Sequence, residues 1–97
     1  MADVNDSFLL REYAERQSEA AFNELVQRHL DFVYSVALRY VENPPDAQDV
    51  AQAVFIILAK KSANLCRRAT LTGWLYEATR LTARQLLRTK ARRFGRE

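Results

Sequence analysis

The chain has few of the residues that build disulfide frameworks, metal centres or loop-rich folds. Its 97 residues include one cysteine, one histidine, two glycines and two prolines. A single cysteine cannot form an intramolecular disulfide, and one cysteine with one histidine does not supply the four ligands of a structural zinc site. We therefore expect a reduced cytoplasmic environment, no metal and no cofactor, with Cys66 an ordinary small side chain.

Long apolar runs are also missing. The longest one, residues 53–59, is much shorter than the roughly 20 residues that span a membrane, and residues 1–6 are polar and acidic, unlike a signal peptide. Paired catalytic carboxylates and a phosphate-binding glycine loop are absent too, so we do not expect an enzyme. The hydrophobic fraction of 48% is enough for one small domain spanning residues 1–97.

Charge is distributed unevenly along the chain. Residues 1–59 carry four basic and ten acidic side chains, a net charge of −6, whereas residues 60–97 carry eleven basic and two acidic ones, a net charge of +9. This asymmetry indicates an anionic partner for the second half, with nucleic acid first and an anionic membrane surface second.

The apolar periodicity predicts helices throughout and no strands, so the fold class is an all-α bundle of about four helices. The predicted helices cover Ser7–Glu15 with Asp6 or Ser7 as cap, Ser18 to about Glu42, Pro45–Lys61 and Thr72–Arg93, with a polar basic loop over residues 62–71. On the second helix His29 falls on the apolar stripe, which favours a packed histidine with a hydrogen-bond partner. On the last helix, the predicted core side consists of Trp74, Leu75, Ala78, Leu81, Thr82 and Leu86.

Two surfaces are not explained by packing. A helical wheel of residues 45–61 places Asp49, Gln52 and Ile56 opposite the core, with Phe55 at the border. An apolar centre with a polar rim is suited to binding a partner helix. An ordinary solvent-exposed face that happens to contain an isoleucine is an equal alternative.

The second surface is a row of side chains four residues apart on the last helix: Tyr76, Arg80, Arg84, Arg88 and Arg92. Like charges at this spacing destabilise a helix, so an anionic partner is expected, and arginine suits phosphate. The preceding loop adds polar and basic groups that can hydrogen-bond base edges.

Three segments resemble bacterial sigma factors of the extracytoplasmic-function group. Residues 46–55 read DAQDVAQAVF, similar to the D-A-E-D-x-x-Q-x-x-F run of that group, and residues 73–80 read GWLYEATR, similar to its W-L-Y-x-x-x-R/N segment. Residues 21–26 and 34–37 are similar as well. The resemblance covers roughly residues 7–93 and corresponds to the family's region 2, an all-helical domain.

The resemblance implies two partners, core RNA polymerase and promoter DNA. In the family, the helix with the D-x-x-Q segment docks on a coiled coil of the largest polymerase subunit. This implies core-polymerase contacts for Asp46, Asp49, Gln52, Phe55 and Ile56.

The following loop and helix of the family bind the minus-ten promoter element, where the non-template strand is melted and a base is held in a loop pocket. This implies DNA contacts for Lys60, Lys61, Asn64, Arg67, Arg68, Thr72, Trp74, Tyr76, Arg80, Arg84 and Arg88. For Trp74, core packing is the alternative.

The chain departs from the family at several points. Gln48 replaces a common glutamate, and the loop of residues 62–71 has no aromatic side chain. The family's C-terminal helix-turn-helix, which binds the minus-thirty-five element, is not in this chain, so we expect an excised domain or a shortened homologue. The residues do not identify an anti-sigma partner.

Two other classes of function remain open at this point. A stand-alone helical regulator would bind duplex DNA tightly without polymerase, whereas a sigma factor domain would bind weakly alone and prefer single-stranded minus-ten DNA. A membrane-surface helical protein is the third class, because the last helix is basic and amphipathic.

Overall fold

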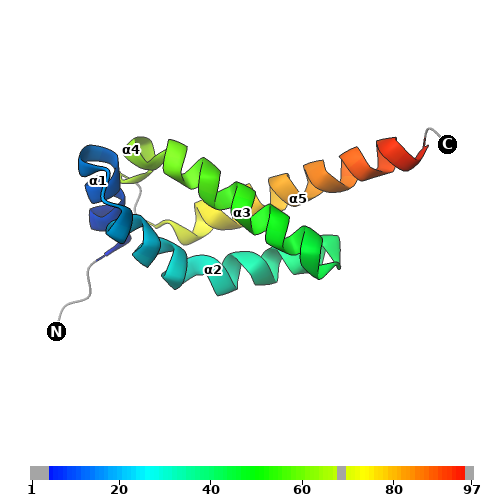
Figure 1. Ribbon diagram of the computed structural model, residues 1–97, viewed down its shortest axis with the longest axis horizontal. Coiled ribbons are helices and arrows are strands. Elements are labelled where there is room, and N and C mark those ends of the chain that lie inside the picture. The colour runs from blue at the N-terminus through cyan, green and yellow to red at the C-terminus, as the bar shows by residue number, and fades with distance from the viewer. Residues whose placement is uncertain (1–4, 68–69, 96–97) are drawn as a thin grey trace.

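The computed structural model describes residues 5–67 and 70–95, and over these residues the secondary structure is entirely helical. Figure 1 shows α2 and α3 crossing as a pair, α1 and α4 together at one end, and α5 running along the bundle and beyond it. The prediction of an all-α bundle is confirmed. The helices are α1 (Asp6–Arg16), α2 (Glu19–Val41), α3 (Pro44–Lys60), α4 (Ser62–Leu65) and α5 (Thr72–Gly95).

The first three helices begin at side-chain caps. The predicted cap of α1 is wrong: Asn5 rather than Asp6 or Ser7 accepts a hydrogen bond from the Phe8 backbone N–H, at 2.8 Å. The caps of α2 and α3 are Ser18 and Asn43, and α3 starts one residue earlier than expected, at Pro44. A proline fits there because the first-turn N–H groups of a helix have no partner within it.

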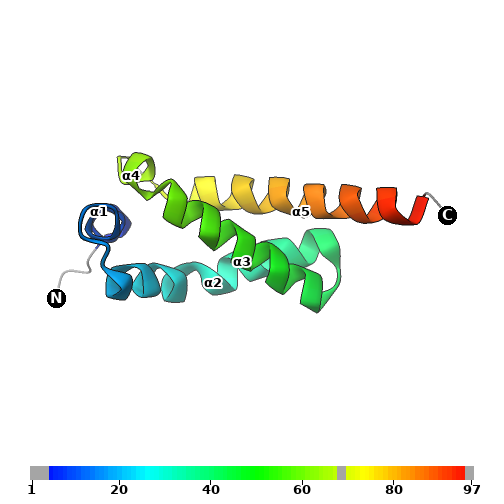
Figure 2. The same cartoon turned by 45° about the horizontal axis from the view of Figure 1, so that its top comes forward.

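The core is built from all the helices. Leu10, Leu25, Leu58 and Leu75 are almost completely buried and come from α1, α2, α3 and α5 respectively. Helix α2 packs against α1, α3 and α5, and is therefore the central element of the bundle. Figure 2 shows α3 crossing between α2 and α5 in projection.

The predicted loop over residues 62–71 is partly helical instead. Ser62 and Leu65 of α4 are buried, and the Ser62 hydroxyl donates to the Ala59 carbonyl at 3.1 Å. Helix α4 packs against α1. Because its leucine completes the core near α1, this segment is held in place rather than looped out.

The predicted core side of α5 is partly wrong. Leu75 is buried as expected, but Leu81 is 56% exposed, whereas Thr79 and Ala83 are completely buried. The Thr79 hydroxyl donates to the Leu75 carbonyl at 2.6 Å, which satisfies its polar group inside the core. A small residue and a threonine allow α5 to approach α2 and α3 closely.

Helix α5 gives the molecule its length. The principal extents are 55 × 23 × 22 Å, and the last turns of α5 project past the other helices (Figure 1). Across residues 5–67 and 70–95, none of the helices combines the length and apolar character that crossing a bilayer would require.

Candidate functional site

An apolar groove lies between α2 and α3. It has a volume of about 320 Å³ and is lined by Phe22, Val26, Leu30, Gln52, Phe55, Ile56 and Ala59. Two of its apolar side chains are open to solvent, with Ile56 51% exposed and Leu30 43% exposed. Apolar side chains gathered in a groove offer more contact than scattered ones, which suits the side of a partner helix.

The outward face of α3 agrees with the helical wheel at three positions. Asp49, Gln52 and Ile56 are all exposed. Phe55 differs from the expectation, because it is only 7% exposed and belongs to the core, although it lines the floor of the groove. An aromatic ring at the border of a helix face packs inward where a neighbouring helix offers apolar contacts, as α2 does here.

Asp46 is placed differently from the other members of the predicted set. Its carboxylate accepts a hydrogen bond from the Lys90 ammonium at 2.5 Å, and its side chain is only 17% exposed. This ion pair joins the first turn of α3 to the distal half of α5. Asp46 therefore has a partner within the chain.

The α2 side of the groove was not identified from the sequence. The sequence did not single out Phe22, Val26 or Leu30 as binding residues. The three residues lie four apart on α2, so a row of apolar side chains beside the buried stripe was the available signal. Only the packing of α3 against α2 turns that row into one wall of a groove.

The basic row on α5 curves around the helix axis instead of running parallel to it. Four residues exceed one helical turn, so each step rotates the row by about 40°. Tyr76, Arg80 and Arg84 share one side of the helix, whereas Arg92 has turned well away from it. Lys90, close to the row in the sequence, is paired with Asp46.

Arg80 has an acidic neighbour on its own helix. Its guanidinium donates to the Glu77 carboxylate at 2.8 Å. This hydrogen bond raises the pKa of Arg80 and lowers the pKa of Glu77. In the described part of the chain, Arg84 and Arg88 are exposed and form no ion pair, so they are free to hold external anions.

Tyr76 connects α5 to α2. Its hydroxyl lies 3.1 Å from the Tyr40 hydroxyl, and its side chain is at the surface, 37% exposed. The hydrogen bond with Tyr76 raises the pKa of Tyr40. This contact attaches the Tyr76 side chain of α5 to α2.

The other predicted DNA contacts are spread around α4 and the start of α5. Lys60, Lys61, Asn64 and Arg67 are exposed, whereas Arg68 lies outside the described residues. Trp74 is half-buried and packs against the core, in line with the packing alternative. Its outer edge borders a groove shared with Lys61.

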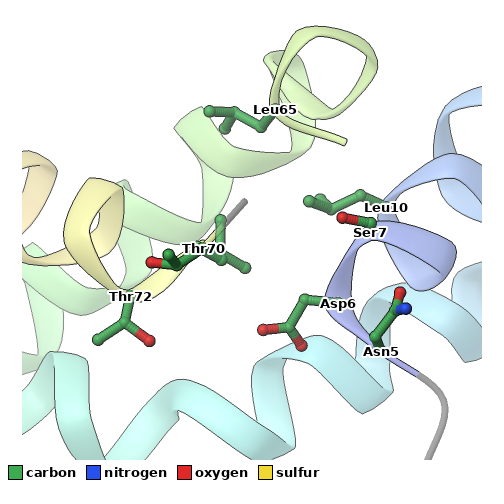
Figure 3. A pocket seen from close by; sticks show the side chains of 8 residues that line it. Asn5, Asp6, Ser7, Leu10, Leu65, Thr70 and Thr72 are labelled. Carbon is green, nitrogen blue, oxygen red and sulfur yellow. The ribbon is translucent and has the colours of Figure 1, made fainter. Parts of the chain in front are cut away.

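A pocket lies between the N-terminus of α1 and the segment that leads into α5. It has a volume of about 270 Å³. Figure 3 shows Asp6 and Thr72 pointing into it from opposite sides, with Leu10 and Leu65 closing another side. This pocket was not predicted from the sequence, because its walls come from residues more than 50 positions apart.

Asp6 is held in the pocket wall by two residues of α2. Its carboxylate lies 2.9 Å from the His29 Nε2 atom and 3.4 Å from an Arg28 guanidinium nitrogen. The predicted packed histidine with a side-chain partner is thereby confirmed. The two contacts fix the direction of the carboxylate and attach α1 to α2.

Comparison with known proteins identifies one family. Residues 25–93 match sigma-70 region 2. The chain is 33% identical over 72 residues to the ECF RNA polymerase sigma factor SigE of Mycolicibacterium smegmatis, covering 74% of this chain and 28% of that protein. It is 31% identical over 84 residues to the RNA polymerase sigma-H factor of Pseudomonas aeruginosa, covering 87% of this chain and 44% of that protein. The chain thus spans less than half the length of both relatives.

Proposed function

The chain belongs to the sigma-70 region 2 family, and we propose that it acts in transcription initiation in the cytoplasm as a module that binds core RNA polymerase and promoter DNA. The α2–α3 groove would bind the polymerase, and α5 with the segment before it would bind and help to melt the minus-ten element. The sigma factor family is non-enzymatic. Strand opening would therefore draw on binding energy, with unstacking costing a few kcal/mol per base.

The α2–α3 groove is the observation that supports binding to core RNA polymerase. Ile56 stands 51% exposed at the edge of an apolar depression, and Gln52 provides a polar group beside it. One helix of a coiled coil would bury these side chains along its length. Asp49, exposed on the same face, favours basic side chains on the partner.

The DNA half rests on the free cations of α5 and of the α4 region. Arg84 and Arg88 suit phosphates, because a guanidinium holds two phosphate oxygens at once. Asn64 and Arg67 are exposed on the segment before α5 and can reach base edges. The pairing of Arg80 with Glu77 leaves part of its guanidinium free to contact DNA.

The polymerase half is tested by the double variant Gln52→Ala with Ile56→Asp. A carboxylate at residue 56 would be buried without a partner in the complex, which costs about 3 to 5 kcal/mol. We expect this variant to bind core RNA polymerase about 100-fold or more weakly. The polymerase should then no longer copurify with it. The helical circular dichroism signal should be unchanged, because Ile56 and Gln52 are exposed in the free protein.

Leu81→Asp is the matched control. Leu81 is 56% exposed on α5 and does not line the α2–α3 groove, so it tests the same loss of an apolar surface residue at a different place. It should keep polymerase binding. Copurification that survives Gln52→Ala with Ile56→Asp, or that is lost equally with Leu81→Asp, would contradict the assignment of the groove.

A further inference from the structure

We propose that the Asp46–Lys90 ion pair is an autoinhibitory contact, in which a carboxylate of α3 occupies an ammonium group of α5 that would otherwise bind a DNA phosphate. The inference rests on the proposed binding of DNA by α5 and adds an intramolecular competitor to it. It is carried by the geometry of the pair, by the position of Lys90 on α5 and by the charge of the surrounding segment.

The pair places an anionic oxygen where a phosphate oxygen would bind. The Lys90 Nζ atom lies 2.5 Å from the Asp46 Oδ2 atom. A phosphate oxygen would form the same kind of charge-assisted hydrogen bond with this ammonium group. The Lys90 side chain is 40% exposed, whereas that of Asp46 is 17% exposed. Solvent therefore reaches the ammonium group, and an external anion can compete with the carboxylate for it.

Lys90 projects from the side of α5 on which the basic row begins. It follows Tyr76 by fourteen residues, which is close to four helical turns, so the two side chains project about 40° apart and about 21 Å apart along the axis. Arg92, by contrast, projects about 160° away from Tyr76. A strand that runs parallel to α5 past Tyr76 and Arg80 would therefore meet Lys90 rather than Arg92.

The segment around Lys90 has no acidic side chain of its own. Residues 80–95 carry six basic side chains and no acidic one. In the part of the chain that the structure describes, two carboxylates pair with this segment, Glu77 with Arg80 and Asp46 with Lys90. Such a positively charged segment attracts anions. Asp46 therefore supplies from α3 a negative charge that a DNA strand would otherwise supply.

The test measures the binding of a fluorescein-labelled dodecameric oligo-dT to the full chain by fluorescence anisotropy, at several low salt concentrations where weak electrostatic binding is retained. Asp46→Asn keeps the shape of the side chain and removes its charge. We expect this variant to bind about two- to fivefold more tightly, because a partly exposed ion pair is a weak competitor. Its logarithmic salt slope should be steeper by about 0.7, the value of one added contact to single-stranded DNA.

The effect of Lys90→Ala should depend on whether the carboxylate is present. In the otherwise unaltered chain it should weaken binding less than about twofold, because the ammonium group is already occupied, whereas in Asp46→Asn it should abolish the whole gain. Asp49→Asn is the matched control. It removes the same charge three residues further along α3, from an exposed side chain that forms no ion pair among the described residues. It should raise the affinity less and leave the salt slope unchanged.

The outcomes distinguish this inference from the proposed function. An unchanged affinity in Asp46→Asn, an equal gain in Asp49→Asn, or a gain that survives the added Lys90→Ala would overturn the autoinhibitory contact and leave DNA binding intact. If circular dichroism shows that Asp46→Asn is unfolded, the single variants Lys90→Ala and Arg84→Ala decide. Arg84→Ala should then weaken binding more, and an equal loss in both overturns the inference. Failure of the unaltered chain to bind oligo-dT at low salt would overturn the DNA half of the proposed function as well.

Discussion

The α2–α3 groove and the basic row of α5 differ in how they are built. The groove needs two helices, because its apolar side chains come from both α2 and α3 and its floor includes the core residue Phe55. The row lies on one helix, and its cations continue onto turns that project from the bundle (Figure 1). A surface shared by two packed helices depends on the tertiary structure, whereas a charged row exists wherever the helix forms.

The two surfaces should therefore respond differently to salt. Four arginine or lysine contacts to single-stranded DNA give a logarithmic salt slope of about −2.8, so a fourfold rise in salt weakens binding about 50-fold. Arg80→Ala with Arg84→Ala should reduce that loss to about sevenfold. Fluorescence anisotropy of a labelled oligonucleotide at several salt concentrations measures both slopes.

A control with the same change in net charge is available on α1. Arg11→Ala with Arg16→Ala removes two exposed cations that are not on α5 and should keep the slope of the unaltered chain. Polymerase binding through the apolar groove should change much less over the same range of salt, because burial of apolar surface is not screened. Equal slopes for both double variants would rule out phosphate contact by Arg80 and Arg84.

The Asp46–Lys90 ion pair offers a second test of the two surfaces, because it connects α3, which lines the groove, to α5, which carries the basic row. In the described part of the chain it is the one ion pair that joins α3 to α5. Lys90→Ala should lower the free energy of unfolding by about 0.5 to 1 kcal/mol, because the pair is partly exposed. Urea unfolding followed by circular dichroism measures the change.

A double-mutant cycle assigns this loss to the pair itself. Asp46→Ala with Lys90→Ala should cost no more than about 1 kcal/mol in total, since both single variants remove the same interaction. Lys60→Ala, which changes an exposed lysine that takes no part in this contact, should have little effect on stability. Strictly additive losses would show that Asp46 and Lys90 act independently.

The smallest expected effect concerns the contact between Tyr40 and Tyr76. The hydrogen bond with Tyr76 raises the pKa of Tyr40, so the protonated form is favoured in the folded chain. Its contribution to stability is present below the usual tyrosine pKa of about 10 and is lost as the pH rises through the higher folded value. Tyr76→Phe should return the pKa of Tyr40 toward its usual value in a nuclear magnetic resonance titration of the ring.

Tyr34→Phe provides the comparison for this titration. Tyr34 is another half-buried tyrosine of α2, and its hydroxyl does not contact Tyr40 among the contacts described. The pKa of Tyr40 should therefore stay raised in this variant. A value that does not move in Tyr76→Phe would show that the hydrogen bond is not its cause.

Much of the local structure could be predicted from the sequence because it depends on neighbours along the chain. Helix periodicity, the start of the second helix near Ser18 and the outward position of Ile56 follow from spacing and side-chain type within a few residues. The uneven charge of the two halves follows from composition alone. The family resemblance rests on such local runs, and the match of residues 25–93 bears it out.

The tertiary structure alone decided which surfaces form sites. The helical period does not say which neighbour covers a border position. Phe55 was placed at the border and is buried, whereas Leu81 was placed inside and is exposed. The pocket between α1 and α5 joins Asp6 to Thr72, and the groove joins Leu30 to Ile56. Such pairs lie far apart in sequence, and their meeting depends on how α1, α2, α3 and α5 bury their leucines against one another.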